Sequence, residues 1–279
     1  HNMNNTSVEI VLVLYGVLPE ESKAFVSLLR HIGRLRVDYE LIVYNNDTSV
    51  SVPDGDGYIA VNAEKNDMLA RAYNFALQKA QAGGRQWLLL LDHDTEPTAE
   101  YFEALNRFLN QTTPSPDVVA AVPLLKYGNR IISPEKINPV IWKTTPITVA
   151  GTYSGNITAF NSLSLLSTDF VMSIGGFSEL YPLDMLDHWL YRQIAVHKKS
   201  VEVLDIYISH SLSLLDNSMS YNRLADFLAA EQRFVATELT MTHYISYKIR
   251  LAIRFIKQWI RLRDRRRTQI TFKALIGKK

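Results

Sequence analysis

Two hydrophobic patterns alternate along the first part of the chain. Short runs of β-branched and aliphatic residues end in glycine, asparagine or aspartate, as buried strands do where they leave a sheet; they span residues 8–16, 39–47, 57–62 and 86–94. Residues 20–35 and 66–84 instead carry apolar positions at a helical spacing and end near glycines. Because consecutive parallel strands need a crossover, this order predicts an α/β domain. Its mostly parallel, Rossmann-like sheet should have helices on both faces.

The alternation weakens after residue 114. Residues 118–125, 130–133, 148–160 and 162–168 predict short strands and loops in a more antiparallel arrangement. A glycine turn at residues 175–176 then leads into a predicted helix, and residues 200–212 predict a last strand that ends at His210. The sequence contains no internal repeat and no low-complexity linker. We therefore predict a single catalytic-type domain over residues 1–220.

Residues 221–279 predict a helical and basic extension. Helical spacing aligns an apolar stripe on one side of it, formed by Ile245, Ile249, Ala252, Ile256 and Ile260, and places most basic residues elsewhere. One interpretation is an interfacial helix over residues 244–267 on an anionic membrane, where each basic residue contributes roughly 1 kcal/mol. The other is a stripe that packs on protein, either on the domain itself or on a second subunit. In the second case the protein would be a homo-oligomer.

Composition and charge narrow the classes of function. The 279 residues include no cysteine, which excludes disulfides and thiolate metal sites. The formal net charge of +2 is uneven: residues 248–279 carry twelve Lys or Arg against one acid, a net +11, which leaves −9 for residues 1–247. That negative body argues against a nucleic-acid partner. No apolar run reaches the roughly 18 residues of a membrane span, and the first residues lack a signal-peptide pattern, so we expect a cytoplasmic location.

The strand over residues 86–94 ends in two acids. Asp92 and Asp94 alternate with His93, so an extended backbone presents both carboxylates on one side. Mg²⁺ and Mn²⁺ commonly bind through one or two carboxylates together with a substrate's phosphates, and His210 could complete such a site. The alternative is structural: Asp94 or Thr95 would be the N-cap of the helix predicted over residues 95–109.

A second pair of acids precedes residues typical of a helix. Asp184 and Asp187 are three positions apart, which places both on one face if the helix includes them. Either could act as a general base if it lies within reach of an acceptor hydroxyl. The alternative is a pair of solvated acids, which the helix dipole favours at an N-terminus.

Taken in order, these motifs resemble glycosyltransferase family 2, the inverting nucleotide-sugar transferases of GT-A fold, and within it the rhamnosyltransferase-like branch. The resemblance covers residues 8–215 and rests on LIVYNND, NDMLARAYNFAL, LLLLDHDTEP and GGFSELYPLDMLDHWLYR. It implies that the metal ligands are Asp94, Asp92 and His210, and that Asp187 is the catalytic base, with Asp184 as its rival. The residues implied to bind the nucleotide sugar are Tyr15, Asn45, Asn46, Asp47, Asn66, Asn74, Asp92 and His93. Those implied on the acceptor side are His188, Trp189 and Arg192, although Trp189 suits a core position equally well.

The resemblance also implies an activity. A divalent metal, Mg²⁺ or Mn²⁺, would assist inverting transfer from a dTDP- or UDP-linked sugar, with rhamnose as the first candidate. The acceptor would be a lipid-linked or polysaccharide glycan of a bacterial cell surface, and the enzyme would lie on the inner face of the plasma membrane. Two alternatives stay open. A sugar nucleotidyltransferase would carry a glycine-rich, basic loop after the first strand, whereas LYGVLPEES is neither; a non-catalytic scaffold would act through the basic tail.

Overall fold

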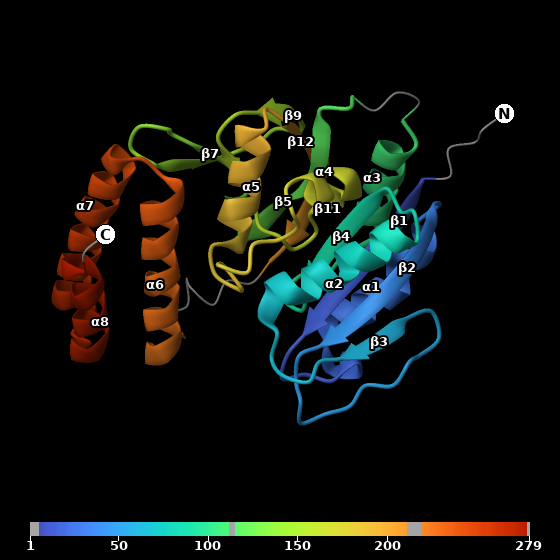
Figure 1. Ribbon diagram of the computed structural model, residues 1–279, viewed down its shortest axis with the longest axis horizontal. Coiled ribbons are helices and arrows are strands. Elements are labelled where there is room, and N and C mark those ends of the chain that lie inside the picture. Colours follow the sequence, from blue (N-terminus) through green and yellow to red (C-terminus); the bar gives the residue numbers. More distant parts are fainter. Residues whose placement is uncertain (1–5, 112–114, 211–218, 278–279) are drawn as a thin grey trace. The chain divides into compact units, whose positions relative to one another are not determined.

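The computed structural model describes residues 6–111, 115–210 and 219–277 (Figure 1). The chain divides into two compact units, which we name by their content. The sheet unit comprises residues 1–136 and 146–211, and the helical unit comprises residues 137–145 and 212–279. Residues 137–145 belong to the helical unit although the last strand of the sheet follows them, a feature for which the sequence carries no signal.

In the described part of the chain, nine strands form the central sheet in the order β3-β2-β1-β4-β11-β5-β12-β9, with β6 paired to β5. Its parallel half contains β1 (Ser7–Leu14), β2 (Asp38–Asn45), β3 (Ile59–Asn62) and β4 (Trp87–Asp92). In the other half β5 (Val118–Tyr127) and β12 (Ser200–Ser209) are parallel, whereas β6 (Arg130–Ser133), β9 (Gly151–Ser154) and β11 (Leu165–Ser167) are antiparallel. A smaller sheet has the order β10-β7-β8, from Ile157–Thr158, Glu135–Ile137 and Thr144–Pro146.

Helices cover this sheet, as the sequence pattern predicts. They are α1 (Lys23–His31), α2 (Met68–Ala82), α3 (Ala99–Leu109), α4 (Thr168–Ser173) and α5 (Leu186–Val196), with short 3₁₀ turns at Pro19–Glu21 and Ile32–Arg34. Right-handed crossovers that run in opposite directions place α1 and α2 on opposite faces of the sheet. Every residue of β1 is buried, as are the four leucines of β4. The predicted α/β architecture is confirmed.

The helix after β4 begins later than the sequence analysis expects. Thr98 is its N-cap, and the Thr98 hydroxyl accepts a hydrogen bond from the Tyr101 amide at 3.2 Å. The structural alternative, in which Asp94 or Thr95 caps this helix, is therefore wrong, because Thr98 supplies the capping oxygen. Thr95 instead pairs with His210 through an isolated antiparallel bridge. Asp94 is thus released from the structural role that competed with metal binding.

The helical unit contains α6 (Tyr221–Glu238), α7 (Met241–Lys257), the short π-helical turn η3 (Gln258–Leu262) and α8 (Arg265–Ile276). The continuous basic helix expected over residues 244–267 is wrong, because the chain turns at Arg263. Arg263 has a left-handed φ of 47°, and the Asp264 carboxylate accepts hydrogen bonds from the amides of Arg266 and Arg267, each at 3.1 Å. Asp264 is therefore the N-cap of a new helix.

The predicted apolar stripe lies on the outside of α7 and η3. Its four isoleucines are 49–67% exposed, so the stripe is not packed into the core of the described structure; they are Ile245, Ile249, Ile256 and Ile260. Inside the unit, Trp142 of the 137–145 segment contacts the rings of Phe234 and His243. Among the described residues, no helix is both long and apolar enough to cross a membrane.

Candidate functional site

The carboxyl ends of neighbouring parallel strands bring the predicted polar residues to one edge of the sheet. In register, Leu14 of β1 lies beside Asn45 of β2, and Val13 lies beside Asp92 of β4. A cavity of about 240 Å³ opens at this edge, and we name it the strand-end cavity. The residues predicted to bind nucleotide sugar or metal that line it are Tyr15, Asn46, Asn66, Asp92, His93 and Asp94.

Asp92 is held at the end of β4 by hydroxyl groups from two other segments. The fully buried Tyr73 of α2 donates a hydrogen bond to Asp92 Oδ1 at 2.7 Å, and the Ser162 hydroxyl accepts one from the Asp92 amide at 3.1 Å. Burial, the largest influence, raises the pKa of Asp92 to about 6 against the opposing hydrogen bond from Tyr73. The negative charges of Asp94 and Asp187 raise this pKa further, so a cation at this point would favour the ionised carboxylate.

Asp94 forms an ion pair with its neighbour. His93 Nε2 lies 2.8 Å from Asp94 Oδ1, and this hydrogen bond lowers the pKa of Asp94 and raises the pKa of His93. Both side chains also line a neighbouring cavity of about 550 Å³, together with Lys23, Lys126 and His210. Asp94 is therefore an ionised carboxylate, 44% exposed, that lines both cavities.

His210 lies just beyond β12, as the sequence predicts. Its Nδ1 is 2.7 Å from the Thr95 hydroxyl, which ties the end of β12 to the segment after β4. Burial lowers the pKa of His210, and the charge of Asp94 opposes this effect. The imidazole is thus kept in its neutral form, within electrostatic reach of Asp94.

The donor set at this edge fits a hard divalent cation that is held partly by a substrate. Among the described residues, no group of three or more His, Asp or Glu side chains is close enough to hold a metal, so Asp92, Asp94 and His210 are not gathered into a closed cage. Mg²⁺ and similar ions are commonly bound by one or two carboxylates, with phosphate oxygens and water as the other ligands. Asp94 and Asp92 supply that carboxylate pair beside a cavity.

The asparagines after β2 shape the edge of the sheet. Asn46 is 2% exposed, and its side chain bonds to the start of α2. Its Nδ2 donates a hydrogen bond to the Met68 carbonyl at 2.8 Å, and its Oδ1 accepts one from the backbone amide of Asp67 at 3.0 Å. Asn45 is 1% exposed, and its side chain bonds to the 47–50 turn. Asp47 accepts hydrogen bonds from Ser49, which lower the pKa of Asp47. Asn46 lines the strand-end cavity, and Asn45 and Asp47 fold the loop beside it.

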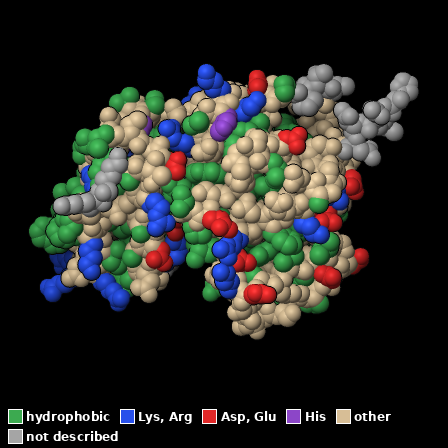
Figure 2. All heavy atoms as spheres, in the orientation of Figure 1, with side chains coloured by type: hydrophobic (Ala, Val, Ile, Leu, Met, Phe, Trp, Pro, Cys, Tyr) green, Lys and Arg blue, Asp and Glu red, His purple; other side chains and the backbone are tan. Residues whose placement is uncertain are grey.

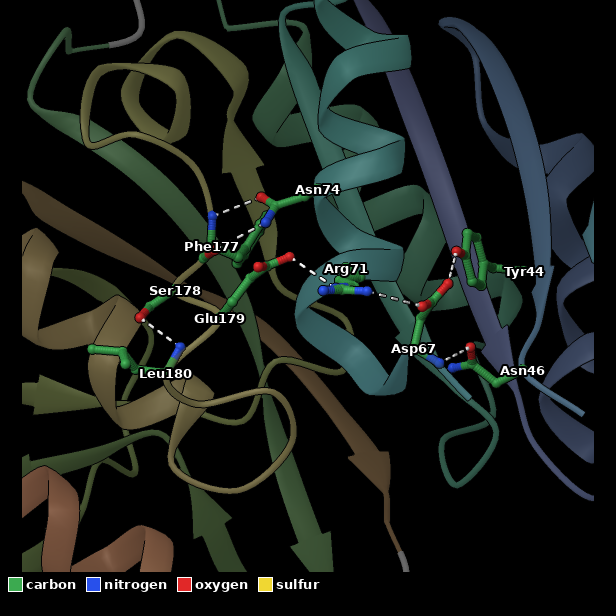
Figure 3. Close-up of polar contacts among 9 residues, drawn as sticks. All are labelled: Tyr44, Asn46, Asp67, Arg71, Asn74, Phe177, Ser178, Glu179 and Leu180. Carbon is green, nitrogen blue, oxygen red and sulfur yellow. Dashed lines mark hydrogen bonds and ion pairs between the residues drawn. The ribbon is translucent and has the colours of Figure 1, made fainter. Parts of the chain in front are cut away.

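A polar network that the sequence analysis missed fixes α2 beside this edge (Figure 3). Tyr44 of β2 donates a hydrogen bond to Asp67 Oδ2 at 2.7 Å, and Asp67 lies 3.7 Å from Arg71. Arg71 Nε then donates to Glu179 at 3.0 Å, in the segment before α5. The spacing of Asp67 and Arg71 is a helical i, i+4 pair, which was a usable signal; the contact with Glu179 depends on the tertiary fold.

Asn74 joins α2 to the glycine turn. Its side-chain Nδ2 donates a hydrogen bond to the backbone carbonyl of Phe177 at 2.9 Å, and its Oδ1 accepts one from the backbone amide of Phe177 at 2.8 Å (Figure 3). Gly176 has a φ of +85°, and a Cβ at that position would lie 2.7 Å from Asn74 Oδ1. The glycine is thus required by this close approach. Asn74 positions the segment that leads to α5, and its binding of the nucleotide stays a prediction.

Asp187 and Asp184 occupy different environments. Helix α5 begins at Leu186, so Asp187 lies in its first turn, where the helix dipole favours a negative charge. Its charge raises the pKa of Asp92 and also that of the buried Tyr73 and Tyr191. Asp184 precedes the helix, so the expectation that both acids share one helical face is wrong. The cause is Met185, whose left-handed φ of 65° separates the loop from the helix.

The predicted acceptor-side residues lie along α5. His188 Nδ1 is 3.2 Å from the Thr158 hydroxyl, and Arg192 is half-buried one turn later. Trp189 is 8% exposed and belongs to the hydrophobic core, in agreement with the alternative that the sequence left open. The acceptor-side roles of His188 and Arg192 stay predictions.

Comparison with known proteins identifies the fold. No protein-family model and no curated protein matches the sequence. Residues 1–349 of S. aureus TarS, in complex with UDP-GlcNAc, match with a TM-score of 0.54 and 12% identity over 93% of this chain and 74% of that one. The mannosyltransferase PcManGT from Pyrobaculum calidifontis, in complex with GDP-Man and Mn²⁺, matches with a TM-score of 0.54 and 12% identity over 98% and 76%. The chain has the GT-A fold.

Proposed function

We propose that this protein is a glycosyltransferase that moves a sugar from a nucleoside diphosphate to an acceptor hydroxyl. The observation that carries the proposal is the strand-end cavity, where Asp92, Asp94 and Asn46 meet at the carboxyl edge of the sheet. In open α/β sheets this edge is the usual place for a ligand. The complexes of TarS with UDP-GlcNAc and of PcManGT with GDP-Man and Mn²⁺ support the same class of donor.

The donor would occupy the strand-end cavity and extend into its neighbour. Tyr15, Asn46 and Asn66 would contact the nucleotide, and His93 and Asp94 would lie beside the diphosphate. The neighbouring cavity of about 550 Å³ is within the size range of small-molecule sites. Lys23 and Lys126 of its wall would contact phosphate oxygens, and a cation would offset the acids Glu21, Asp94 and Glu96 that also line it.

Asp94 and Asp92 would hold Mg²⁺ or Mn²⁺ with oxygens of the diphosphate, and the bound ion would neutralise charge on the leaving group. The chain's own residues prepare this site. The hydrogen bond from His93 keeps Asp94 ionised, and Tyr73 orients the Asp92 carboxylate. His210 would add a neutral imidazole near Asp94.

Asp187 would act as the general base. It would accept the proton of the acceptor hydroxyl while that oxygen bonds to the anomeric carbon and the bond from this carbon to the diphosphate oxygen breaks. Attack from the face opposite the leaving group inverts the anomeric centre, and no covalent enzyme intermediate is needed. We favour Asp187 over Asp184 because the charge of Asp187 reaches Asp92 in the strand-end cavity.

The acceptor would be lipid-linked and the enzyme peripheral on an anionic membrane, at the inner face of the plasma membrane in bacterial glycan synthesis. The exposed isoleucine stripe of α7 and the basic residues around it support this part of the proposal. For the donor, rhamnose linked to dTDP is the first sugar to test, followed by UDP- and GDP-linked sugars.

Calorimetric titration of UDP, dTDP and GDP with Mn²⁺, Mg²⁺ or EDTA tests the donor site. We expect one of the diphosphates to bind in the presence of metal and to lose at least tenfold in affinity, about 1.4 kcal/mol, in Asp94→Ala. Asp205→Ala, at an exposed acid of β12, is the matched control and should bind as the wild type does. Failure of all three diphosphates to bind under every metal condition would contradict the proposal.

A further inference from the structure

The helical unit contains a pocket of its own, unrelated to the strand-end cavity. It has a volume of about 670 Å³ and is lined by Met219, just before α6, and by side chains of α6, α7, η3 and α8. We name it the basic groove, because its lining includes the cations Arg250, Arg254, Lys257, Arg261 and Arg267. Figure 2 shows Lys and Arg side chains beside hydrophobic ones over α7 and α8.

The charges of the basic groove are only partly compensated. Arg254 lies 3.5 Å from Glu231, and Arg267 lies 3.3 Å from Asp264. Within the described part of the chain, neither Lys257 nor Arg261 forms an ion pair. A concave surface with surplus positive charge suits an anion, and guanidinium groups match phosphate oxygens in particular.

Apart from Gln258, the rest of the lining is hydrophobic. Leu224 is 8% exposed and Phe227 is half-buried on α6, and they face the groove together with Met219 and Ile253. A small inorganic anion would leave this apolar wall uncovered. A ligand that combines a phosphate with a hydrocarbon chain would satisfy both parts of the lining, because apolar area removed from water is stabilising.

The position of the basic groove on α7 relates it to the exposed stripe. Arg250, Arg254 and Lys257 follow an i, i+4, i+7 spacing and therefore share one face of α7. Arg261 of η3 lines the same groove. Ile253 lines the groove and is also 48% exposed, so it links that face to the isoleucine stripe next to it. A bilayer that touched the stripe would bring lipid headgroups to the mouth of the groove.

We propose that the basic groove binds one phosphate-bearing lipid, with the phosphate between Lys257 and Arg261 and the hydrocarbon chain against Leu224, Phe227 and Ile253. This site rests on the membrane association in the proposed function and deepens it, since it adds a stoichiometric lipid site to a surface contact. The lipid would bind in the basic groove whether or not the protein transfers a sugar.

A short-chain lipid in solution tests the site without a bilayer. Dihexanoyl phosphatidic acid, kept below its micellar concentration, would be titrated calorimetrically into the full chain. We expect saturable binding of one lipid per chain, weakened at least tenfold in Lys257→Gln/Arg261→Gln. The matched control is Arg263→Gln/Arg265→Gln, two exposed arginines that line a different, aromatic pocket beside α8; it should change the affinity less than twofold.

Three outcomes would overturn the assignment. Absence of lipid binding would remove the site, and equal losses in both variants would show a general effect of charge. Binding of inorganic phosphate as tight as that of the lipid would show an anion site in which the apolar wall has no part. UDP titrated into the same variants reads the strand-end cavity separately, so a failed lipid site and a failed donor site give different results.

Discussion

Burial raises the pKa of two acids on neighbouring strands, Asp92 of β4 and Glu9 of β1. The consequences differ because only Asp92 lies at a cavity. Asp92 ends β4 at a cavity, where a cation can reach it and restore its ionised form. Glu9 lies inside β1 and is 0% exposed, with Arg85 Nε at 3.0 Å. Burial is the main cause that raises the pKa of Glu9 to about 8; the neighbouring Glu40 adds to it, and Arg85 and Lys79 oppose it. Protonation of Glu9 should therefore affect the free energy of unfolding and not the chemistry at the strand-end cavity.

Glu9→Gln should change how stability depends on pH. Between the ordinary pKa of 4.5 and the folded-state value of about 8, the folded protein keeps a proton that the unfolded chain releases. The free energy of unfolding of the wild type should consequently fall as pH rises through this window, by about 1.4 kcal/mol for each unit of pKa shift realised. The variant lacks this ionisation, so its stability relative to wild type should increase from pH 5 to pH 8.5 in urea unfolding.

The control for this measurement is Glu103→Gln, at an exposed glutamate of α3 that pairs with Arg34. Its free energy of unfolding should follow the wild-type pH dependence. A constant difference between Glu9→Gln and wild type across the pH range would contradict the assignment of a raised pKa to Glu9.

At the scale of elements, periodicity predicted most of the sheet unit. The strands over residues 8–16, 39–47 and 86–94 were predictable because a buried strand needs a continuous apolar run, and the meeting of their polar ends was predictable because parallel strands share a carboxyl edge. This reasoning brought together Asn46, Asp92 and Asp94, which line the strand-end cavity. It requires only local pattern and one rule of topology.

The remaining differences arise where several local signals compete or where the contact is distant in sequence. Asp94, Thr95 and Thr98 are all acceptable N-caps, and the bridge between Thr95 and His210 decides among them. Asp264 is the single acid in a basic stretch with helical spacing, and the same residue is a strong N-cap that starts α8. The joining of residues 137–145 to the helical unit depends on Trp142 packing against rings of α6 and α7, which no local pattern encodes.

Gly176→Ala should loosen the connection between α2 and the segment before α5. The added Cβ would lie 2.7 Å from Asn74 Oδ1 at a φ of +85°, so we expect a loss of about 1–3 kcal/mol in the free energy of unfolding. In an Asn74→Ala background the same change should cost less, because the clashing atom is gone. A double-mutant cycle in urea measures this coupling.

Gly33→Ala provides the comparison for that cycle, since a Cβ there would meet no atom within 4 Å. It should change the free energy of unfolding by less than about 0.5 kcal/mol. Additive effects of Gly176→Ala and Asn74→Ala would show that the backbone conformation alone, and not the contact with Asn74, requires the glycine.

For the whole molecule, the separation of charge is the feature that no single element explains. Residues 248–279 carry a net +11 and the rest of the chain −9, so an anionic surface attracts one end and repels the other. Ile249, Ile256 and Ile260 of the exposed stripe lie within the basic end of the chain. Apolar contact and electrostatic attraction therefore act on the same helices, which is the combination that holds an interfacial helix on a membrane.

Vesicle flotation should show this combined dependence. We expect the protein to float with vesicles that contain anionic lipid, and less so at 1 M salt, where the Debye length falls to about 3 Å. Ile249→Ser/Ile256→Ser removes two exposed members of the stripe and should weaken flotation about tenfold, whereas Val149→Ser/Val196→Ser, at exposed valines of the sheet unit, should not.

Equal flotation with neutral and anionic vesicles would rule out the electrostatic part, and equal effects of both double variants would rule out the stripe as the contact. Loss in the stripe variant with short-chain lipid binding intact would place the bilayer contact on α7 and leave the basic groove as a separate site.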